Sequence, residues 1–299
     1  MKQQIKSSLI LLLTATIWGV AFVAQSVGME YIGPFTFNAI RCVLGGLVLI
    51  PVILVLKKKK ETGAENQEKE DKKTLWTGGI ACGVILCIAS NLQQFGIMEA
   101  SVGKSGFFTA LYIVMIPVIG IFIGKRPGIK LWFCVALAVV GMYLLCMKDG
   151  SFTIERADIM LLLCALAFSF HILVVDYFSP KVDGVKMSCI QFFVCGVLSA
   201  VGMLFTETPD IPNIQAAWLP LLYAGLLSCG VGYTLQIVGQ KGINPVIASL
   251  IMSLESVISA LAGWVILGQV LSPKEILGCV LMFVAIIITQ IPIGNKKTD

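Results

Sequence analysis

The chain has 299 residues, of which 57% are hydrophobic and only 13% are charged. Soluble domains average about 25% charged residues, so this composition excludes an ordinary soluble protein and indicates an integral membrane protein. The formal net charge of +5 does not indicate nucleic-acid binding, because the basic residues lie beside apolar runs.

The apolar runs are about 20 residues long and do not alternate with polar residues, which excludes strands as the spanning element. The expected fold is therefore an all-α integral membrane protein. Turn residues such as Gly33-Pro34 and Asn244-Pro245 separate the helices. Ten helices are predicted, at Ser7–Gln25, Pro34–Leu56, Leu75–Ile97, Val102–Ile123, Lys130–Met147, Asp158–Phe178, Val185–Phe205, Trp218–Gly239, Pro245–Leu267 and Lys274–Ile291.

Basic residues set the expected orientation. Lys2 and Lys6 precede the first apolar run, but no small-x-small cleavage site follows, so this run is predicted to be a membrane helix rather than a signal peptide. With a cytoplasmic N-terminus, the inner side would carry most of the 22 lysine and arginine residues. The outer side would carry only Lys104, Lys148, Arg156 and Lys274. Both termini are therefore predicted to be cytoplasmic, in a cell or inner membrane.

Two other features have plain interpretations. The Lys57–Lys73 loop is predicted to be a solvated inner loop, with contact to anionic lipid as the sharper alternative. The cysteines all fall within apolar runs and form no C-x-x-C pair, so we expect small hydrophobic residues rather than a metal site or a disulfide framework. They are Cys42, Cys82, Cys87, Cys134, Cys146, Cys164, Cys189, Cys195, Cys229 and Cys279. No metal and no cofactor is expected.

The two halves of the chain, residues 1–147 and 148–299, match one another. Ile40-Arg41 falls on Ile190-Gln191 with a shift of 150 residues, and Leu92-Gln93-x-x-Gly96 returns as Leu235-Gln236-x-x-Gly239. A repeat of five helices is odd-numbered, so the second copy must enter the membrane from the opposite side. Such inverted repeats are typical of secondary transporters, whose substrate site lies near the midplane between the halves.

Several motifs along the chain resemble one known family. They are Ile17-Trp18-Gly19-Val20-Ala21-Phe22, the Arg41 helix, Leu92-Gln93-Gln94-Phe95-Gly96, Pro117, Ser253-Leu254-Glu255-Ser256-Val257 and Leu267-Gly268. The chain is similar to the EamA-domain members of the drug/metabolite transporter superfamily, which often have Gly-Glu where this chain has Gly268-Gln269. The resemblance implies a ten-helix fold, alternating access and export of amino acids or other small metabolites.

Glu255 is the strongest candidate site residue. It lies near the middle of the span Pro245–Leu267, where a carboxylate costs several kcal/mol unless it faces a wet cavity or a partner. One interpretation is a structural acid that hydrogen-bonds the nearby serines Ser249, Ser253, Ser256 and Ser259. The other is a site residue that binds substrate or handles protons, with Arg41 or His171 as its partner.

Other polar residues in the spans have two interpretations each. Arg41 either snorkels to the outer interface or binds a substrate carboxylate through its guanidinium fork. His171, the single histidine, is either a hydrogen-bonded core residue or part of a proton relay. Gln93 and Gln236 occupy matched repeat positions, so both are expected at one central cavity unless they only join helices.

Aromatic residues are the candidate cavity walls, with ordinary packing as the alternative for each. They are Trp18, Phe22, Tyr112, Phe168 and Trp264. Tyr233, in the same span as Gln236, is a further candidate for the site unless it only joins helices.

Two features of the sequence would suit an enzyme, a phosphate loop and a serine–histidine pair. Gly103-Lys104-Ser105 lacks the first glycine of a phosphate loop, because Met98 stands there. An intramembrane serine protease would need Ser105 within hydrogen-bond reach of His171, although the topology separates the two in depth.

The prediction is therefore a secondary-active transporter, not an enzyme, that moves a small molecule across the bilayer, with protons as a possible coupling ion. A facilitative uncoupled carrier is the alternative within transport. A membrane enzyme or a non-transporting scaffold is the alternative from another class. The sequence leaves the substrate, the direction of transport and the oligomeric state open.

Overall fold

The computed structural model describes residues 2–62, 71–100, 102–124, 127–146, 155–268 and 272–290, and this part of the chain contains helices and no strands. The helices are α1 (Lys2–Met29), α2 (Pro34–Thr62), α3 (Lys72–Glu99), α4 (Val102–Ala110), α5 (Tyr112–Phe122), α6 (Ile129–Cys146), α7 (Arg156–Phe178), α8 (Gly184–Thr206), α9 (Ile211–Ala216), α10 (Trp218–Leu222), the π-helix η1 (Tyr223–Tyr233), α11 (Thr234–Gln240), α12 (Pro245–Met252), α13 (Leu254–Leu267) and α14 (Pro273–Gln290).

Eight helical stretches within the described residues are long and apolar enough to cross a membrane. They correspond to eight of the ten predicted spans. The other two, at Lys130–Met147 and Lys274–Ile291, form α6 and α14, whose apolar cores Ile129–Gly141 and Ile276–Ile288 are shorter. The domain boundary at residues 147 and 148, the middle of the Lys57–Lys73 loop and Gln269 lie outside the described residues.

Two of the predicted spans are interrupted in mid-membrane. Leu111 separates α4 from α5, and Ser253 separates α12 from α13. At both points the backbone forms tight i→i−3 hydrogen bonds, including Leu111 N–H to Phe108 O at 3.2 Å and Ser256 N–H to Ser253 O at 3.1 Å. Proline within a helix removes a backbone donor and predicts a bend or break at Pro117, but α5 continues through the proline and the interruption lies at Leu111.

A third span changes its helix type. From Tyr223 to Tyr233 the chain winds as a π-helix between α10 and α11. Glycines let α2 approach this segment closely: a Cβ added to Gly45 would lie 2.5 Å from the Cβ of Cys229. A Cβ added to Gly225 would lie 2.7 Å from the Cβ of Leu44. The backbones of α2 and η1 therefore lie close together at these small residues, as at many membrane helix crossings.

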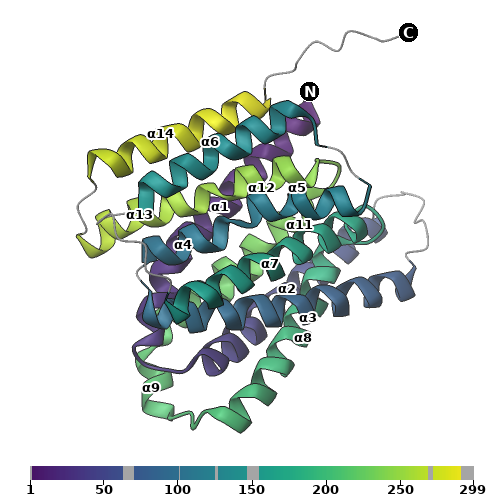
Figure 1. Ribbon diagram of the computed structural model, residues 1–299. Helices are drawn as coiled ribbons and strands as arrows, with labels where there is room; N and C mark the ends of the chain where they lie inside the picture. Colours follow the sequence, from purple (N-terminus) through teal and green to yellow (C-terminus); the bar gives the residue numbers. More distant parts are fainter. Residues whose placement is uncertain are drawn as a thin grey trace.

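The helices pack in layers (Figure 1). The yellow α14 lies beside α6 along one edge, while α3 packs against α7 and α8 on the opposite side. Between these layers α2 packs against α8 and η1, and α1 packs against α13, η1 and α11. The small-residue face of α13 meets α4 through Gly106, where an added Cβ would lie 2.8 Å from the Oγ of Ser259.

Polar side chains cap several helix starts. The Thr74 hydroxyl and the Lys73 backbone N–H donate to the Asp71 carboxylate at the start of α3. These hydrogen bonds, above all the one from Thr74, lower the pKa of Asp71 below its ordinary value. Asp183 and Asn244 cap α8 and α12.

One helix start is capped from another helix. Glu207, at the end of α8, accepts hydrogen bonds from the backbone N–H groups of Phe35 at 2.9 Å and Thr36 at 2.8 Å, and from the Thr36 hydroxyl at 2.6 Å. The carboxylate therefore caps α2. Gly33 makes room for it, because an added Cβ there would lie 2.3 Å from the Glu207 carboxyl carbon.

Candidate functional site

A buried chamber lies among the helices of both halves. Its walls come from α1, α2, α3, α4, α5, α7, η1, α11 and α13. The lining residues are Trp18, Ala21, Phe22, Gln25, Arg41, Gln93, Thr109, Tyr112, Phe168, Ile172, Ser228, Tyr233, Gln236 and Glu255. Neither α6 nor α14 contributes, which agrees with their position at the edge in Figure 1.

The chamber is contracted. The volume within it that the centres of water-sized spheres can occupy is about 30 Å³, enough for about two water molecules. A metabolite-sized ligand needs several hundred Å³, so the helices must separate before one can bind. A hollow lined by Ile5, Lys6, Leu9, Ile10 and Leu13 lies on α1 alone and carries no comparable polar chemistry.

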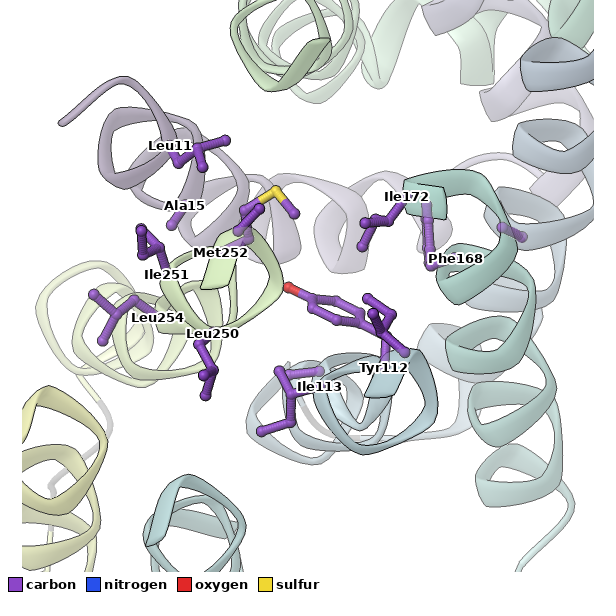
Figure 2. Packing of buried hydrophobic residues seen from close by; sticks show 14 of the residues in the cluster. Leu11, Ala15, Tyr112, Ile113, Phe168, Ile172, Leu250, Ile251, Met252 and Leu254 are labelled. Carbon is purple, nitrogen blue, oxygen red and sulfur yellow. The ribbon is translucent and has the colours of Figure 1, made fainter. Parts of the chain in front are cut away.

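The interrupted helices meet at the chamber through one hydrogen bond. Tyr112 begins α5 directly after the first interruption, and Glu255 is the second residue of α13, after the second interruption. The Tyr112 hydroxyl donates to the Oε1 of Glu255 at 3.0 Å, with both residues almost fully buried. In Figure 2 the tyrosine reaches from its own helix towards Met252, with Phe168 and Ile172 on the other side of the ring.

The expected partners of Glu255 were wrong. Neither Arg41 nor His171 forms a hydrogen bond or ion pair with it; Tyr112 does. The serines are not its partners either, because each hydroxyl donates to the backbone one turn earlier, as Ser256 does to Ser253 O and Ser259 to Ser256 O, both at 2.8 Å. The serine face is satisfied internally and serves close helix packing.

Arg41 lines the chamber and is 2% exposed. Its Nη1 donates to the Oε1 of Gln25 at 2.7 Å, and its guanidinium lies 5.7 Å from the ring centre of Phe37. Its Nε has no hydrogen-bond partner in the described part of the chain, where Arg41 also forms no ion pair. Arg41 therefore does not snorkel to the interface, and it holds an uncompensated charge beside the chamber.

Gln93 and Gln236 line the same chamber from opposite halves. The Nε2 of Gln93 donates to the Thr109 hydroxyl at 3.3 Å. Gln236 is 1% exposed, and its Oε1 has no partner among the described residues. Other amides, by contrast, join helices: Asn91 bonds Asn38 at 2.9 Å and Ser199 at 3.0 Å.

Aromatic rings form much of the wall. Trp18 and Tyr233 pack with ring centres 4.6 Å apart, and the Nε1 of Trp18 points to Ser228 O at 3.4 Å. Phe22 and Phe168 complete the wall. Trp264, also expected here, is 49% exposed and does not line the chamber, because it lies on the outward side of α13.

His171 lies behind the lining rather than in it. Its Nε2 is 3.1 Å from the Oε1 of Gln191, and its ring packs edge-on against Tyr233 with centres 6.0 Å apart. The Nδ1 of His171 and the hydroxyl of Ser105 both lack a hydrogen-bond partner. The serine protease geometry is therefore not present.

Five lining residues were not anticipated: Ala21, Gln25, Thr109, Ile172 and Ser228. Two carried a signal in the sequence. Gln25 is a lone amide at the end of an apolar run, and Thr109 matches Ser253 in the repeat. Ala21, Ile172 and Ser228 have the ordinary character of membrane helices, so only the packing identifies them.

Comparisons with known proteins identify a family and transporter relatives. The model described as "EamA-like transporter family" matches residues 5–147 and again residues 155–291. An "Uncharacterized transporter" of Archaeoglobus fulgidus is 27% identical over 94% of this chain and 84% of its own. "Uncharacterized transporter YwfM" of Bacillus subtilis is 23% identical over 97% of this chain and 96% of its own.

A solved structure described only as "Crystal structure of protein" superposes with a TM-score of 0.76 at 17% sequence identity. It covers 95% of this chain and 96% of its own. At that identity the likeness concerns the fold alone.

Proposed function

This chain belongs to the EamA-like transporter family, and we propose that it is a secondary-active exporter of amino acids or related small metabolites, with the buried chamber as its substrate site. The observation that carries the proposal is the charge arrangement of the lining. Among the described lining residues Arg41 supplies the one guanidinium and Glu255 the one carboxyl group, and both are almost fully buried.

A zwitterion complements these two groups. Its carboxylate suits the Arg41 fork, whose Nε has no protein partner. Its ammonium group suits Glu255 and the unpartnered Oε1 of Gln236. The rings of Trp18 and Tyr233 offer apolar surface and cation–π contacts.

Exchange for protons follows from the cost of burying a lone carboxylate. Glu255 is almost fully buried and accepts one hydrogen bond from Tyr112, so in the empty chamber a proton satisfies it at less cost than a bare charge. A substrate ammonium group replaces that proton. Each passage of substrate in one direction then carries a proton in the other.

The packing supports two inverted five-helix repeats, residues 1–147 and 148–299. If each helix is replaced by its repeat counterpart, the main contacts recur: α3 on α7 and α8 becomes η1 on α1 and α2, with α11 also on α1. The contacts of α1 with α12 and α13 become those of α7 with α4 and α5. The match of the family model to residues 5–147 and again to residues 155–291 supports the same division.

The interrupted helices are then the moving parts. Leu111 and Ser253 occupy closely corresponding repeat positions, and Tyr112 and Glu255 follow them at the chamber. Secondary transporters bind substrate at such discontinuous helices near the midplane. We place both termini in the cytoplasm of a cell that holds the protein in its inner or plasma membrane, with alternating access to the chamber.

The test is a transport assay with the full chain in lipid vesicles. Vesicles with an acidic lumen should accumulate labelled amino acids from a neutral medium, because protons leaving the lumen exchange for substrate. A panel of zwitterionic, decarboxylated and N-acetylated analogues identifies the required charges. Uptake that ignores the pH gradient would instead indicate a facilitative carrier, and no uptake across the panel would contradict the substrate class.

A further inference from the structure

Cysteines that are far apart in the sequence gather behind the chamber. The Sγ of Cys42 on α2 lies 3.4 Å from the Sγ of Cys195 on α8. Cys229 on η1 lies close enough to Cys42, and Cys87 on α3 close enough to Cys195, for their side chains to interact. Cys42, Cys195 and Cys229 are all at most 1% exposed. Sequence spacing gave no sign of this cluster.

The closest pair joins the two halves of the molecule. Cys42 belongs to the first half and Cys195 to the second, and α2 and α8 pack tightly along their length. Close helix approach keeps the sulfurs facing each other: a Cβ added to Gly196 would lie 3.1 Å from a methyl group of Val43. The backbone therefore holds the two sulfurs at contact distance.

The cluster also borders the chamber. Cys42 follows Arg41, and Cys229 follows Ser228, and both preceding residues line the chamber. The guanidinium of Arg41 is close enough to Cys42, Cys195 and Cys229 to interact with them electrostatically. Reactive cysteines are found beside such positive groups.

A bond between two sulfurs fits this geometry better than a metal ion does. In the described ranges, no three His, Cys, Asp or Glu side chains are placed so that they could share a metal. The two sulfurs at 3.4 Å need to approach by only about 1.4 Å to reach disulfide length.

We propose that Cys42 and Cys195 are an oxidisable thiol pair, which a small two-electron oxidant such as hydrogen peroxide converts into a disulfide that joins the two halves. The first thiolate attacks peroxide, forms a sulfenic acid and releases hydroxide, which takes up the thiol proton as water. The second thiol displaces the sulfenic oxygen as a second water. Two thiols lose two protons and two electrons, and peroxide becomes two water molecules.

The proposed function requires the two halves to move against each other. If it is right, the disulfide would stop transport. It would fix α2 to α8 beside Arg41. The contracted chamber, with room for about two waters, could then not widen to admit substrate. Reduction by a dithiol would restore movement.

The chemical step is tested without any transport assay. A protease site is inserted in the segment 147–154 between the halves, and the purified chain is treated with peroxide, blocked with maleimide, cleaved and run on a non-reducing gel. Wild type should run as one band, and as two fragments after dithiothreitol. Cys42→Ser and Cys195→Ser should give two fragments in both conditions.

Cys82→Ser is the matched control, because Cys82 is equally buried but lies in a separate apolar cluster with Leu75, Val175 and Met187. It should behave as wild type. Two fragments from oxidised wild type would overturn the inference. So would a cross-link that survives in Cys42→Ser, because Cys87 and Cys195 could also join the halves.

Transport supplies the second readout. Peroxide should lower the rate of wild type at least tenfold, with recovery in dithiothreitol, and should leave Cys42→Ser unchanged. A cross-linked protein that still transports at full rate would overturn the inference that the disulfide controls transport. A cross-linked protein that transports nothing even after reduction contradicts the proposed function and leaves the thiol pair standing.

Discussion

At the scale of single residues, the chamber contains a guanidinium group and a carboxyl group that do not meet. Arg41 is held by Gln25 and Glu255 by Tyr112, in both cases through one hydrogen bond to a neutral partner. A neutral partner holds each group less firmly than an opposite charge would, because the Coulomb attraction between two full charges is absent. Both groups therefore remain available to a ligand that carries both signs.

Glu255→Gln tests the role of the carboxyl group. The amide keeps the shape and can still accept from Tyr112, but it can neither take up a proton nor pair with an ammonium group. A hydrogen bond to a charged group contributes about 1.5–3 kcal/mol, so substrate affinity should fall by roughly 10- to 100-fold. Accumulation driven by the pH gradient should disappear.

The matched control is Tyr112→Phe, which removes only the neutral donor to Glu255 and should retain the pH dependence. Normal rates and a normal pH profile in Glu255→Gln would show that Glu255 is a structural residue and remove it from the site.

Arg41→Lys tests recognition of the substrate carboxylate. Lysine keeps the charge but loses the planar fork and the hydrogen-bond geometry towards Gln25. Affinity for free amino acids should fall roughly tenfold or more, whereas affinity for decarboxylated amines should change little. Binding is measured by displacement of labelled substrate in detergent. Equal losses for amino acids and amines would assign Arg41 to packing.

At the scale of helices, interruption and close approach decide the architecture. The sequence predicted the spans because long apolar runs leave few other structures in a bilayer. It could not predict the interruptions at Leu111 and Ser253, because neither residue breaks helices by its own chemistry. Pro117 carried the local signal, yet α5 continues through it. Packing between α4, α7 and α13 decides where the helix breaks.

The residues of the chamber could be predicted only in part, because their contacts also depend on how the helices pack. Gln93 and Gln236 could be found from the repeat, and Glu255 from its cost at the midplane. The partner of Glu255 could not be found, because it depends on how two interrupted helices meet. His171 was a candidate because a free histidine side chain titrates near neutral pH, but in the structure it contacts Gln191 behind the lining.

Gly45→Ala tests the crossing of α2 and η1. An added Cβ would lie 2.5 Å from the Cβ of Cys229, so α2 must shift or η1 must repack. Overpacking of this kind costs about 1–3 kcal/mol. Unfolding in mixed micelles, followed by circular dichroism, should show that loss. In Gly103→Ala, where nothing lies within 4 Å of an added Cβ, stability should be unchanged or slightly higher; equal effects of the two substitutions would contradict the close crossing.

At the scale of the whole molecule, the asymmetry of basic residues predicts the orientation in the membrane. Asp210 is exposed beside α9, and Lys241 is exposed beyond the end of α11. In a cysteine-free background, Asp210→Cys should react with an impermeant maleimide added outside intact cells. Lys241→Cys should react only after the membrane is opened. The reverse labelling pattern would show that the topology is inverted, and the direction assigned to proton movement would be inverted with it.

The cap on α2 has a consequence for how the protein is made. Thr36 and Glu207 are 171 positions apart, and the ribosome delivers the chain from its amino end. When α2 enters the bilayer, the carboxylate that will satisfy Phe35 and Thr36 has not yet been translated. Until α8 arrives, water must serve the first backbone donors of α2 at the membrane surface. The first turn of α2 is therefore completed only after Glu207 in the second half has been made. A chain that stops before Glu207 leaves α2 frayed at its first turn.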